Sequence, residues 1–504
     1  MTKLRVPTFL LLSALALGGS LRADAPSMAH TMRVDYYHTG KAGADEVFAL
    51  DRVVVEPLPW PGNPKHPLDD TGLGEYFFEV IDRATQTPLY SRGFSTWFDA
   101  WESTPAARGQ YRTFQESIRF PEPKKPVIVR VRRRDRANDF KELWSFAIDP
   151  FDSSVARGTP AAPGKVIEIQ KKGPSSRKLD LLFLGDGYTS KERDKFVADV
   201  RRLTENLFEH EPFHSQRGDF NVWALAPAAQ DSGVARPSAA IDRDSPLGST
   251  YDALGVATYL ATFSDRQVRT AASNAPYDAL VILVNSDVYG GSGIFNNVAV
   301  VAAKSPWAPF LLAHHLGQSL AALAVENFTW AWASPGGGFF SYSEPWQRNI
   351  TLEDDAATVK WHDLATPGLS GKTPWKNDDY ESFGRTFRDR EKAMRAEHRP
   401  ESDFDALRRE EKERSTELLA GTETAEESGE SNEEESDDVE PRSTAPAEPV
   451  APAAPLVGVF EGANHDSDIY NRPQLDCVMF SRNDVDFCAV CRHELEAVIA
   501  LYTK

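Results

Sequence analysis

The residues most able to do chemistry lie in an apolar helical segment that is interrupted by a few polar side chains. The segment 308–326 is mostly apolar, and His314, His315 and Gln318 interrupt it. In the metal-binding pattern H-E-x-x-H, two imidazoles four residues apart face the same side of a helix, and the Glu activates a metal-bound water. Here the same frame, starting at His314, is His-His-Leu-Gly-Gln. The sequence therefore predicts that this helix carries no working metal motif.

The two histidines also have a purely structural interpretation. Histidines are seldom ligands when partners of metal-binding type are missing, so we expect a partly buried, hydrogen-bonded pair. Other donors that could complete a site lie far along the chain, and distance in sequence neither supports nor excludes them. They are His362, His465, Asp466 and Asp468.

Two further segments could border a substrate cleft. Gly290, Gly291 and Gly293 lie in the segment 289–295, where we expect an edge strand and a loop. Glycine there would let an extended peptide approach the backbone by strand addition, although a plain hairpin turn explains the same residues. Met479 could lie in a turn beneath a metal, or it could simply fill the core.

The overall composition limits what kind of protein positions these residues. The chain has 504 residues and a formal net charge of −19, and that excess of acid argues against nucleic-acid binding. With 41% hydrophobic residues the chain can bury ample core, and its length predicts two to four domains. The acid is unevenly placed, because the range 421–440 contains acidic residues and no Lys or Arg.

The N-terminus is typical of a secretory signal peptide. Lys3 and Arg5 precede an apolar run at 6–17, and small residues then lead to Ala23-Asp24-Ala25. The run is shorter than the ~20 apolar residues of a membrane span, and no longer apolar stretch follows it. We expect residues 1–25 to be removed, and the mature protein to be secreted or periplasmic without a membrane span. Cleavage after Ala23 and an uncleaved anchor are the alternatives.

Cysteine occurs only near the C-terminus, as Cys477, Cys488 and Cys491. Outside the cytoplasm a pair of them is expected to oxidise. Structural zinc normally has four ligands, and a Cys-x-x-Cys with one further Cys supplies three, so zinc is the weaker explanation. We expect one disulfide and one thiol, and the spacing does not decide which two cysteines pair. The odd cysteine could be buried as a small hydrophobe.

The pattern of elements predicts two folded domains before an insertion. Residues 26–150 contain short β-type runs separated by Pro and Gly, which indicates a small β-sandwich. His38 and His66 stand among polar residues there, so we expect both at the surface. Residues 151–375 alternate between strands and helices, as in an α/β domain with a mixed or mostly parallel sheet.

A charged insertion is predicted at 376–456. Its first part has a helical, Arg- and Glu-rich composition, and its acidic and Pro-rich second part cannot bury enough surface to order itself. The functional alternative is an acidic arm that binds Ca²⁺ or a basic partner. Residues 457–504 end in an amphipathic helix and complete the α/β domain.

At helix 308–326 the sequence resembles the IgA-peptidase family, family 64 of the metallopeptidases, whose helix typically runs H-E-F-G-H-x-F-A-G-L-A-D-E-Y. The resemblance extends along nearly the whole chain, in the family's order. It includes 32–40, 48–52, 183–189, 220–224, 458–463, 476–479 and 487–492. It implies an α/β zincin-like metallopeptidase domain preceded by a small all-β sandwich domain. Shared chemistry does not follow from a shared fold.

The resemblance assigns positions to individual residues. His314 falls on the first zinc-binding His, His315 replaces the Glu that acts as general base, and Gln318 replaces the second zinc-binding His. Val325 stands where the family has Asp, and Glu326 is retained.

These replacements predict an inactive relative. Catalytic zinc needs about three protein ligands, and a Gln amide is a poor substitute for an imidazole. We therefore expect no cofactor and no catalytic residue. Ala322, in place of the family's Gly, favours a continued helix. Glu326 would then lie roughly 120° around from His314 and about three turns away, too far to complete a site.

Three functions follow as hypotheses. The first is a secreted, non-hydrolytic pseudopeptidase that keeps the scaffold and a cleft for an extended peptide or protein ligand. The second is an active zinc endopeptidase, in which His314 and unforeseen ligands hold the metal. The third is an envelope interaction protein that acts through the acidic insertion. Nothing in the sequence indicates an antibody substrate.

Overall fold

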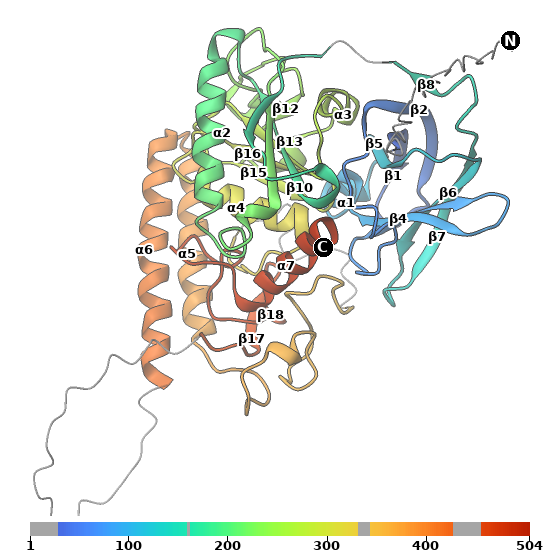
Figure 1. Cartoon of the computed structure of the whole chain (residues 1–504). Coiled ribbons are helices and arrows are strands. Elements are labelled where there is room, and N and C mark those ends of the chain that lie inside the picture. Colours follow the sequence, from blue (N-terminus) through green and yellow to red (C-terminus); the bar gives the residue numbers. More distant parts are fainter. Residues whose placement is uncertain (1–28, 159–161, 331–342, 427–454) are drawn as a thin grey trace, which may run out of the picture.

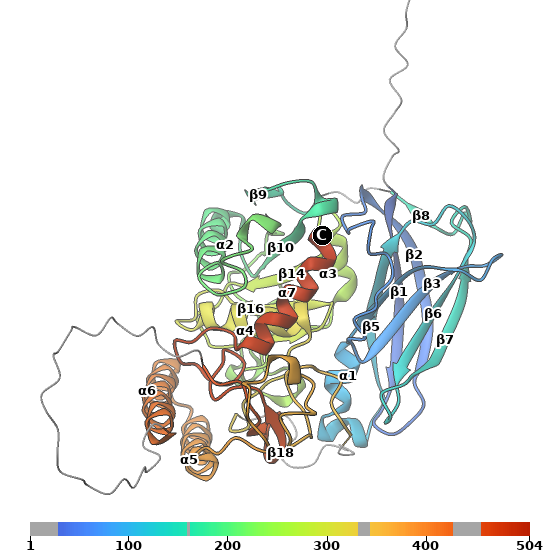
Figure 2. The ribbon, with the colours of Figure 1, turned by 60° about the horizontal axis from the view of Figure 1, so that its bottom comes forward.

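The computed structural model describes residues 29–158, 162–330, 343–426 and 455–504. Within these ranges the chain forms a β-sandwich, an α/β domain and a pair of charged helices beside it (Figures 1 and 2). The signal peptide expected at 1–25 and residues 427–454 of the part expected to be disordered lie outside the described residues. The start of the acidic part, 421–426, is helical instead, as the end of a long helix that begins at residue 401.

The N-terminal domain is a sandwich of two four-stranded sheets, with the strand orders β5-β1-β2-β8 and β4-β3-β6-β7. Alternate residues of a strand point to opposite faces, so Val127, Val129 and Val131 of β6 all enter the core between the sheets. The small β-rich domain predicted from the sequence is confirmed, and its last strand lies beyond residue 150. The strands are β1 (His30–Gly40), β2 (Val47–Pro59), β3 (Tyr76–Asp82), β4 (Pro88–Phe94), β5 (Arg112–Pro121), β6 (Val127–Arg134), β7 (Phe140–Ile148) and β8 (Ala156–Arg157).

A short helix in this domain, α1 (Trp97–Glu102), has no counterpart in the sequence analysis. The side chain of Thr96 caps its first turn by accepting a hydrogen bond from the Asp99 N–H at 3.2 Å. Trp97, Phe98 and Trp101 are buried against the α/β domain. A helix of this length has too few turns to show a period, and the packing partner that stabilises it is distant in sequence.

His38 is a core residue, and its expected position at the surface is wrong. Its imidazole is fully buried in β1, with Nδ1 3.1 Å from Glu116 Oε2 and Nε2 2.8 Å from Glu46 Oε2. Burial opposes the charge, but the two carboxylates outweigh it and raise the pKa of His38 to about 9. The sequence does not reveal this contact, because the three side chains come from β1, β5 and the loop before β2, which meet only in the folded domain.

The α/β domain is built on a six-stranded sheet of order β15-β16-β14-β10-β11-β9. The four inner strands are parallel, and β9 and β15 are antiparallel edges, so the sheet is mixed and mostly parallel as predicted. Its strands are β9 (Ile167–Gln170), β10 (Leu179–Asp186), β11 (Phe220–Leu225), β14 (Ala279–Val284), β15 (Gly291–Ile294) and β16 (Val298–Ala302). Two small antiparallel pairs lie outside it, namely β12 (Ser249–Thr250) with β13 (Ala261–Thr262), and β17 (Phe460–Ala463) with β18 (Asp466–Arg472).

Both faces of this sheet are covered. Leu181 and Phe183 of β10 face a core shared with α2, α4 and α7, whereas Leu182 and Leu184 face α3, α1 and the sandwich. A parallel strand buried on both sides needs an unbroken apolar run, which is what β10 carries. The helices are α2 (Arg193–Leu207), α3 (Asp265–Ala272), α4 (Ala308–Ala321) and α7 (Ala489–Thr503).

The charged insertion begins as two helices, α5 (Asn377–Ala396) and α6 (Glu401–Glu426), which lie side by side at the edge of the α/β domain (Figures 1 and 2). Arg390 and Glu410 form a two-bonded ion pair between them, at 2.6 Å. Among the described residues, none of the helices is long and apolar enough to cross a membrane.

The buried His38 group predicts a pH-dependent stability. Because the pKa of His38 is higher in the folded chain than its ordinary value, its contribution is complete below about pH 6.5 and is lost as the pH rises through 9. Between pH 7 and 10, we expect the free energy of unfolding, measured with urea, to fall by about 2–3 kcal/mol less in His38→Asn than in the wild type.

The half-buried His66 provides a matched control, because no hydrogen bond or ion pair found among the described residues joins its ring to a carboxylate. His66→Asn should keep the wild-type pH slope, and an equal slope in His38→Asn and wild type would refute the role of His38.

Candidate functional site

Helix α4 packs on the sheet beside edge strand β15, and it ends where continuation was expected. Ala322 has a left-handed backbone, with φ of 57°, and its N–H donates to the Gln318 carbonyl at 3.0 Å. The expectation that Ala322 prolongs the helix is therefore wrong. A left-handed alanine costs roughly 1–2 kcal/mol, so the tightly packed surroundings of Ala322 must impose the turn against its propensity.

His314 is held inside the protein as a neutral imidazole. Its Nδ1–H donates to the Val478 carbonyl at 3.1 Å, and its ring packs against Phe310 and Trp330. Burial is the main reason why the pKa of His314 falls to about 3, and the nearby His315 lowers it further. A backbone contact through Nδ1 is also how a metal-binding imidazole is oriented, so this one feature of a zinc site is retained.

His315 and Gln318 are bonded to each other. The His315 Nδ1–H donates to Gln318 Oε1 at 2.8 Å. Burial lowers the pKa of His315 to about 4, which makes it a weak base near neutral pH. The residue in the position of the general base and the residue in the position of the second ligand therefore satisfy each other.

A largely buried, ion-paired cation lies near His314. The guanidinium of Arg482 is bonded to Glu411 at 2.8 Å and lies 4.6 Å from the centroid of the Trp330 ring. Its positive charge reaches His314, where it lowers the pKa of the imidazole. A positive charge that disfavours the protonation of His314 also opposes the binding of a metal cation there.

The other candidate ligands divide into two groups. His465 comes close enough to His314 for their charges to interact, and its Nδ1–H donates to the Trp330 carbonyl at 3.2 Å. His362 instead lies on an exposed turn beside Asp363. Asp466 caps the turn of its own strand by accepting the N–H groups of Asp468 and Ile469. The structure thus adds one imidazole to the site and no carboxylate.

These donors do not fit a catalytic zinc ion. Within the described ranges, no group of three His, Cys, Asp or Glu donors within 4.8 Å of one another contains His314. What surrounds it is neutral imidazole, an amide already in use and a guanidinium.

The charged helices α5 and α6 dock on the segments that contact this site. Arg388 donates to the Thr329 carbonyl at 2.6 Å, next to Trp330. Arg408 of α6 lies 4.1 Å from the ring centroid of Tyr289, just before β15. Together with the ion pair between Glu411 and Arg482, these contacts make the helical pair part of the wall around His314.

The predicted glycine segment forms the edge strand β15, but its glycines serve internal packing. A Cβ on Gly291 would lie 2.3 Å from the His315 ring, and one on Gly293 would lie 2.5 Å from the His315 carbonyl oxygen. The absence of side chains therefore lets α4 approach the sheet closely. A Cβ on Gly290 would meet the Tyr251 ring at 2.6 Å.

The outer edge of β15 is partly occupied by the chain itself. The Gly291 N–H donates to the Thr258 carbonyl at 3.2 Å, and its own carbonyl accepts from Leu260 at 3.4 Å. At the end of the strand, the Phe295 carbonyl accepts from Ser95 of the sandwich at 3.0 Å. The binding of a peptide along Gly290, Gly291 and Gly293 stays a prediction.

Glu326 is separated from His314 by the turn at Ala322. Its carboxylate is fully buried, accepts a hydrogen bond from Asn349 at 2.9 Å, and gathers with Cys477, Cys488 and Cys491. The three cysteines form no disulfide in the structure. Met479 is buried beneath α4, with its sulfur 3.3 Å from the position of a Cβ on Gly317.

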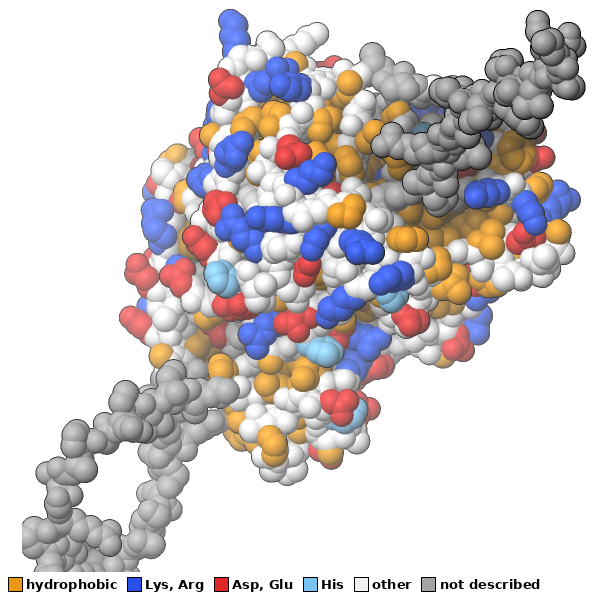
Figure 3. Space-filling view, viewed as in Figure 1, with side chains coloured by type: hydrophobic (Ala, Val, Ile, Leu, Met, Phe, Trp, Pro, Cys, Tyr) orange, Lys and Arg blue, Asp and Glu red, His pale blue; other side chains and the backbone are white. Residues whose placement is uncertain are grey.

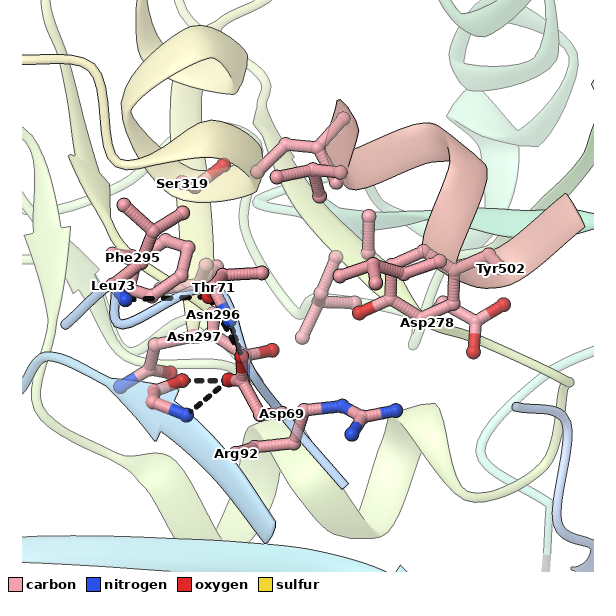
Figure 4. Close-up of a pocket in the computed structure, with 17 residues that line it drawn as sticks. Asp69, Thr71, Leu73, Arg92, Asp278, Phe295, Asn296, Asn297, Ser319 and Tyr502 are labelled. Carbon is pink, nitrogen blue, oxygen red and sulfur yellow. Dashed lines mark hydrogen bonds between the residues drawn. The ribbon is translucent and has the colours of Figure 1, made fainter. Parts of the chain in front are cut away.

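A separate cavity of about 30 Å³ lies where the sandwich meets the α/β domain (Figure 4). Asp69 and Arg92 line it from the sandwich, and Asp278, Asn296 and Tyr502 line it from the other side. This volume holds about two water molecules, so it is too small for a peptide. It does not include His314 or its neighbours.

The fold and this site define a peptidase-related α/β protein with an altered helix motif and an N-terminal β-sandwich. Family models match nearly the whole chain, with the IgA Peptidase M64 model on residues 167–445 and 448–499 and the Peptidase M64 N-terminus model on residues 24–145. The chain therefore belongs to the IgA peptidase M64 family, which confirms the resemblance found in the sequence. No curated protein matches it.

The close contact between α4 and β15 predicts the effect of adding one methyl group. Gly293→Ala should destabilise the protein by about 1–3 kcal/mol, because the added Cβ overlaps the His315 carbonyl oxygen and Gln318. Gly218→Ala, where the Cβ meets nothing within 4 Å, should change stability by less than about 0.5 kcal/mol. Urea unfolding measures both, and equal effects would contradict this account of the glycines.

Proposed function

We propose that this protein is an exported, non-hydrolytic member of the M64 family with a zincin-like scaffold. The observation that carries the proposal is the state of the three motif positions. His314 lies within the electrostatic influence of the Arg482 guanidinium, which is paired with Glu411, and His315 and Gln318 are bonded to each other. The residues that would hold a metal-bound water, and the carboxylate that would activate it, are both replaced.

The general base and the zinc ion each contribute to the rate of a metallopeptidase by a known order of magnitude. A general base contributes about 10²- to 10⁴-fold to a rate. A catalytic zinc contributes by holding and polarising the water, and it needs about three protein ligands and an open position. Neither contribution is available from one neutral imidazole, so we infer that no rescue by His315 occurs.

The zincin-like scaffold is inferred from the arrangement of α4. This helix carries the motif positions and lies against a mixed sheet, next to an antiparallel edge strand. Family membership supports the same inference.

The ligand of such a scaffold is proposed to be an extended peptide or a protein. Its chemistry should not be that of a nucleic acid, because the net charge is −19 and Lys and Arg are interspersed with Asp and Glu on the face seen in Figure 3. Since the edge of β15 is occupied at Gly291 and Phe295, a peptide would have to displace residues 258–260 or bind elsewhere on the scaffold.

The proposal is tested by hydrolysis of casein in the presence of added Zn²⁺. We expect the purified protein to show only the background of a matched His314→Ala preparation, with no change on adding a chelator. Cleavage that a chelator abolishes, and that His314→Ala lacks, would establish an active zinc peptidase instead.

The role of the Arg482 charge is tested by restoring the motif. We expect His315→Glu/Gln318→His to bind zinc through His314 at least about tenfold more weakly than the same variant carrying Arg482→Met, because the guanidinium repels the ion. Competition with a chromophoric chelator measures the affinity, and equal affinities would remove Arg482 from the explanation.

Export is proposed from Lys3, Arg5 and the apolar run that precedes Ala23-Asp24-Ala25. Mass spectrometry of the protein recovered from the medium or periplasm should find a mature chain that starts at Asp24 or Pro26. A full-length chain that stays in the cytoplasm would contradict export.

A further inference from the structure

A second cluster of potential metal ligands lies below α4, away from His314. It consists of Glu326, Cys477, Cys488 and Cys491, whose donor atoms all lie within 4.8 Å of one another. In a tetrahedral zinc site with Zn–S bonds of about 2.3 Å, neighbouring sulfurs are about 3.8 Å apart. The distances between the donor atoms therefore need to shorten by at most about 1 Å for the four atoms to surround an ion.

From this geometry we propose that Glu326, Cys477, Cys488 and Cys491 bind a structural Zn²⁺ ion. The sequence contains three cysteines and shows no fourth ligand beside them. The chain reversal at Ala322 supplies it, since Glu326 comes to lie 3.0 Å from Cys491 Sγ. Three sulfurs and one carboxylate oxygen are ligands that zinc accepts, and four protein ligands close the site to substrate.

Hydrogen bonds to the sulfurs support a thiolate cluster. Cys477 Sγ accepts the N–H groups of Met479 at 3.4 Å and Cys488 at 3.2 Å. Cys488 Sγ accepts the Cys491 N–H at 3.4 Å and caps α7. A neutral thiol or a disulfide sulfur is a weak acceptor, whereas a metal-bound thiolate is a good one, and a helix N-terminus favours its negative charge.

The carboxylate of Glu326 has an unfulfilled bonding capacity. Its Oε1 accepts from Asn349 and, in the metal-free chain, from the Cys491 thiol, which a metal would deprotonate. Its Oε2 is buried and has no hydrogen-bond partner among the described residues. Leaving such an atom unpaired is costly, and a bound cation would satisfy it. A disulfide between two of the cysteines would leave this oxygen as it is.

The surrounding charge also suits a metal. Four anionic ligands and one Zn²⁺ carry two net negative charges, which a buried site must offset. Arg472 is fully buried, and its charge acts on both Glu326 and Cys477. Its guanidinium is held by the carbonyls of Glu461, Gly462 and Leu475, so it can stay fixed beside the cluster.

The ion would join one segment that precedes the insertion to two segments that follow it. Glu326 follows α4, Cys477 precedes the buried Met479, and Cys488 and Cys491 begin α7. All four ligands are buried in the core. Such a site would fasten the C-terminal segment beneath α4, independently of any chemistry at His314.

Metal analysis of the full-length mature protein tests the proposal. After purification without chelators and dialysis, we expect one equivalent of zinc per chain. Cys477→Ser and Cys491→Ser should lose it, while His314→Ala should retain it. A metal-free wild type, loss of zinc in His314→Ala, or an intact mass lower by two hydrogens from a disulfide would each overturn the site.

A wild-type measurement covers the case in which the cysteine variants fail to fold. Substitution with Co²⁺ should give intense absorption bands of a tetrahedral ion together with thiolate-to-cobalt charge transfer. A weak spectrum without charge transfer would contradict thiolate ligands.

The contribution of the carboxylate has its own control. Glu326→Gln should weaken zinc binding by at least about tenfold, measured by competition with a chromophoric chelator. Glu496→Gln, on α7 but outside the cluster, should leave the affinity unchanged. Equal affinities in the two variants would exclude Glu326 as a ligand.

Discussion

The left-handed turn at Ala322 is the constraint on which the rest of this structure depends. It ends α4 directly after the motif positions and reverses the chain, so that Glu326 enters the core next to the cysteines. Had the helix continued, Glu326 would have lain on another side of the same helix. The residues of the family motif are consecutive in sequence, but the turn separates them in space. His314 stays on the helix, and Glu326 lies beneath it.

The two locations handle charge in opposite ways. Around His314 the imidazoles are kept neutral by burial, and the guanidinium of Arg482, although paired with Glu411, lowers the pKa of His314 further. Beneath α4, a carboxylate and three sulfurs converge, with a buried arginine to offset them. A divalent cation is opposed in the first environment and favoured in the second. The protein thereby combines an altered helix motif at His314 with a candidate structural metal site beneath the helix.

The pair of charged helices, α5 and α6, packs against the segments around His314. It contacts Thr329, Tyr289 and Arg482, which belong to three different segments of the α/β domain. The insertion thus packs against the part of the α/β domain that surrounds the motif positions.

Much of the fold was predictable because its signals are local. The apolar run of β10, the periodic apolar residues of α2 and the charged composition of α5 and α6 each lie within a few turns or one strand. The edge position of β15 also followed from its glycines and its place in the chain. Helix α1 and the burial of His38 were missed, since both depend on partners from other strands or from the second domain.

By itself, the sequence determined the domain order, the family and the loss of the metal motif at His314, because residue identity and spacing alone specify which donors a helix can present. Only the tertiary structure decided where the helix stops, since packing around Ala322 outweighs the small intrinsic preference of one alanine. It also decided that Glu326 meets Cys477, Cys488 and Cys491. Distances between residues far apart in the chain depend on how the whole core packs, and no local pattern contains them.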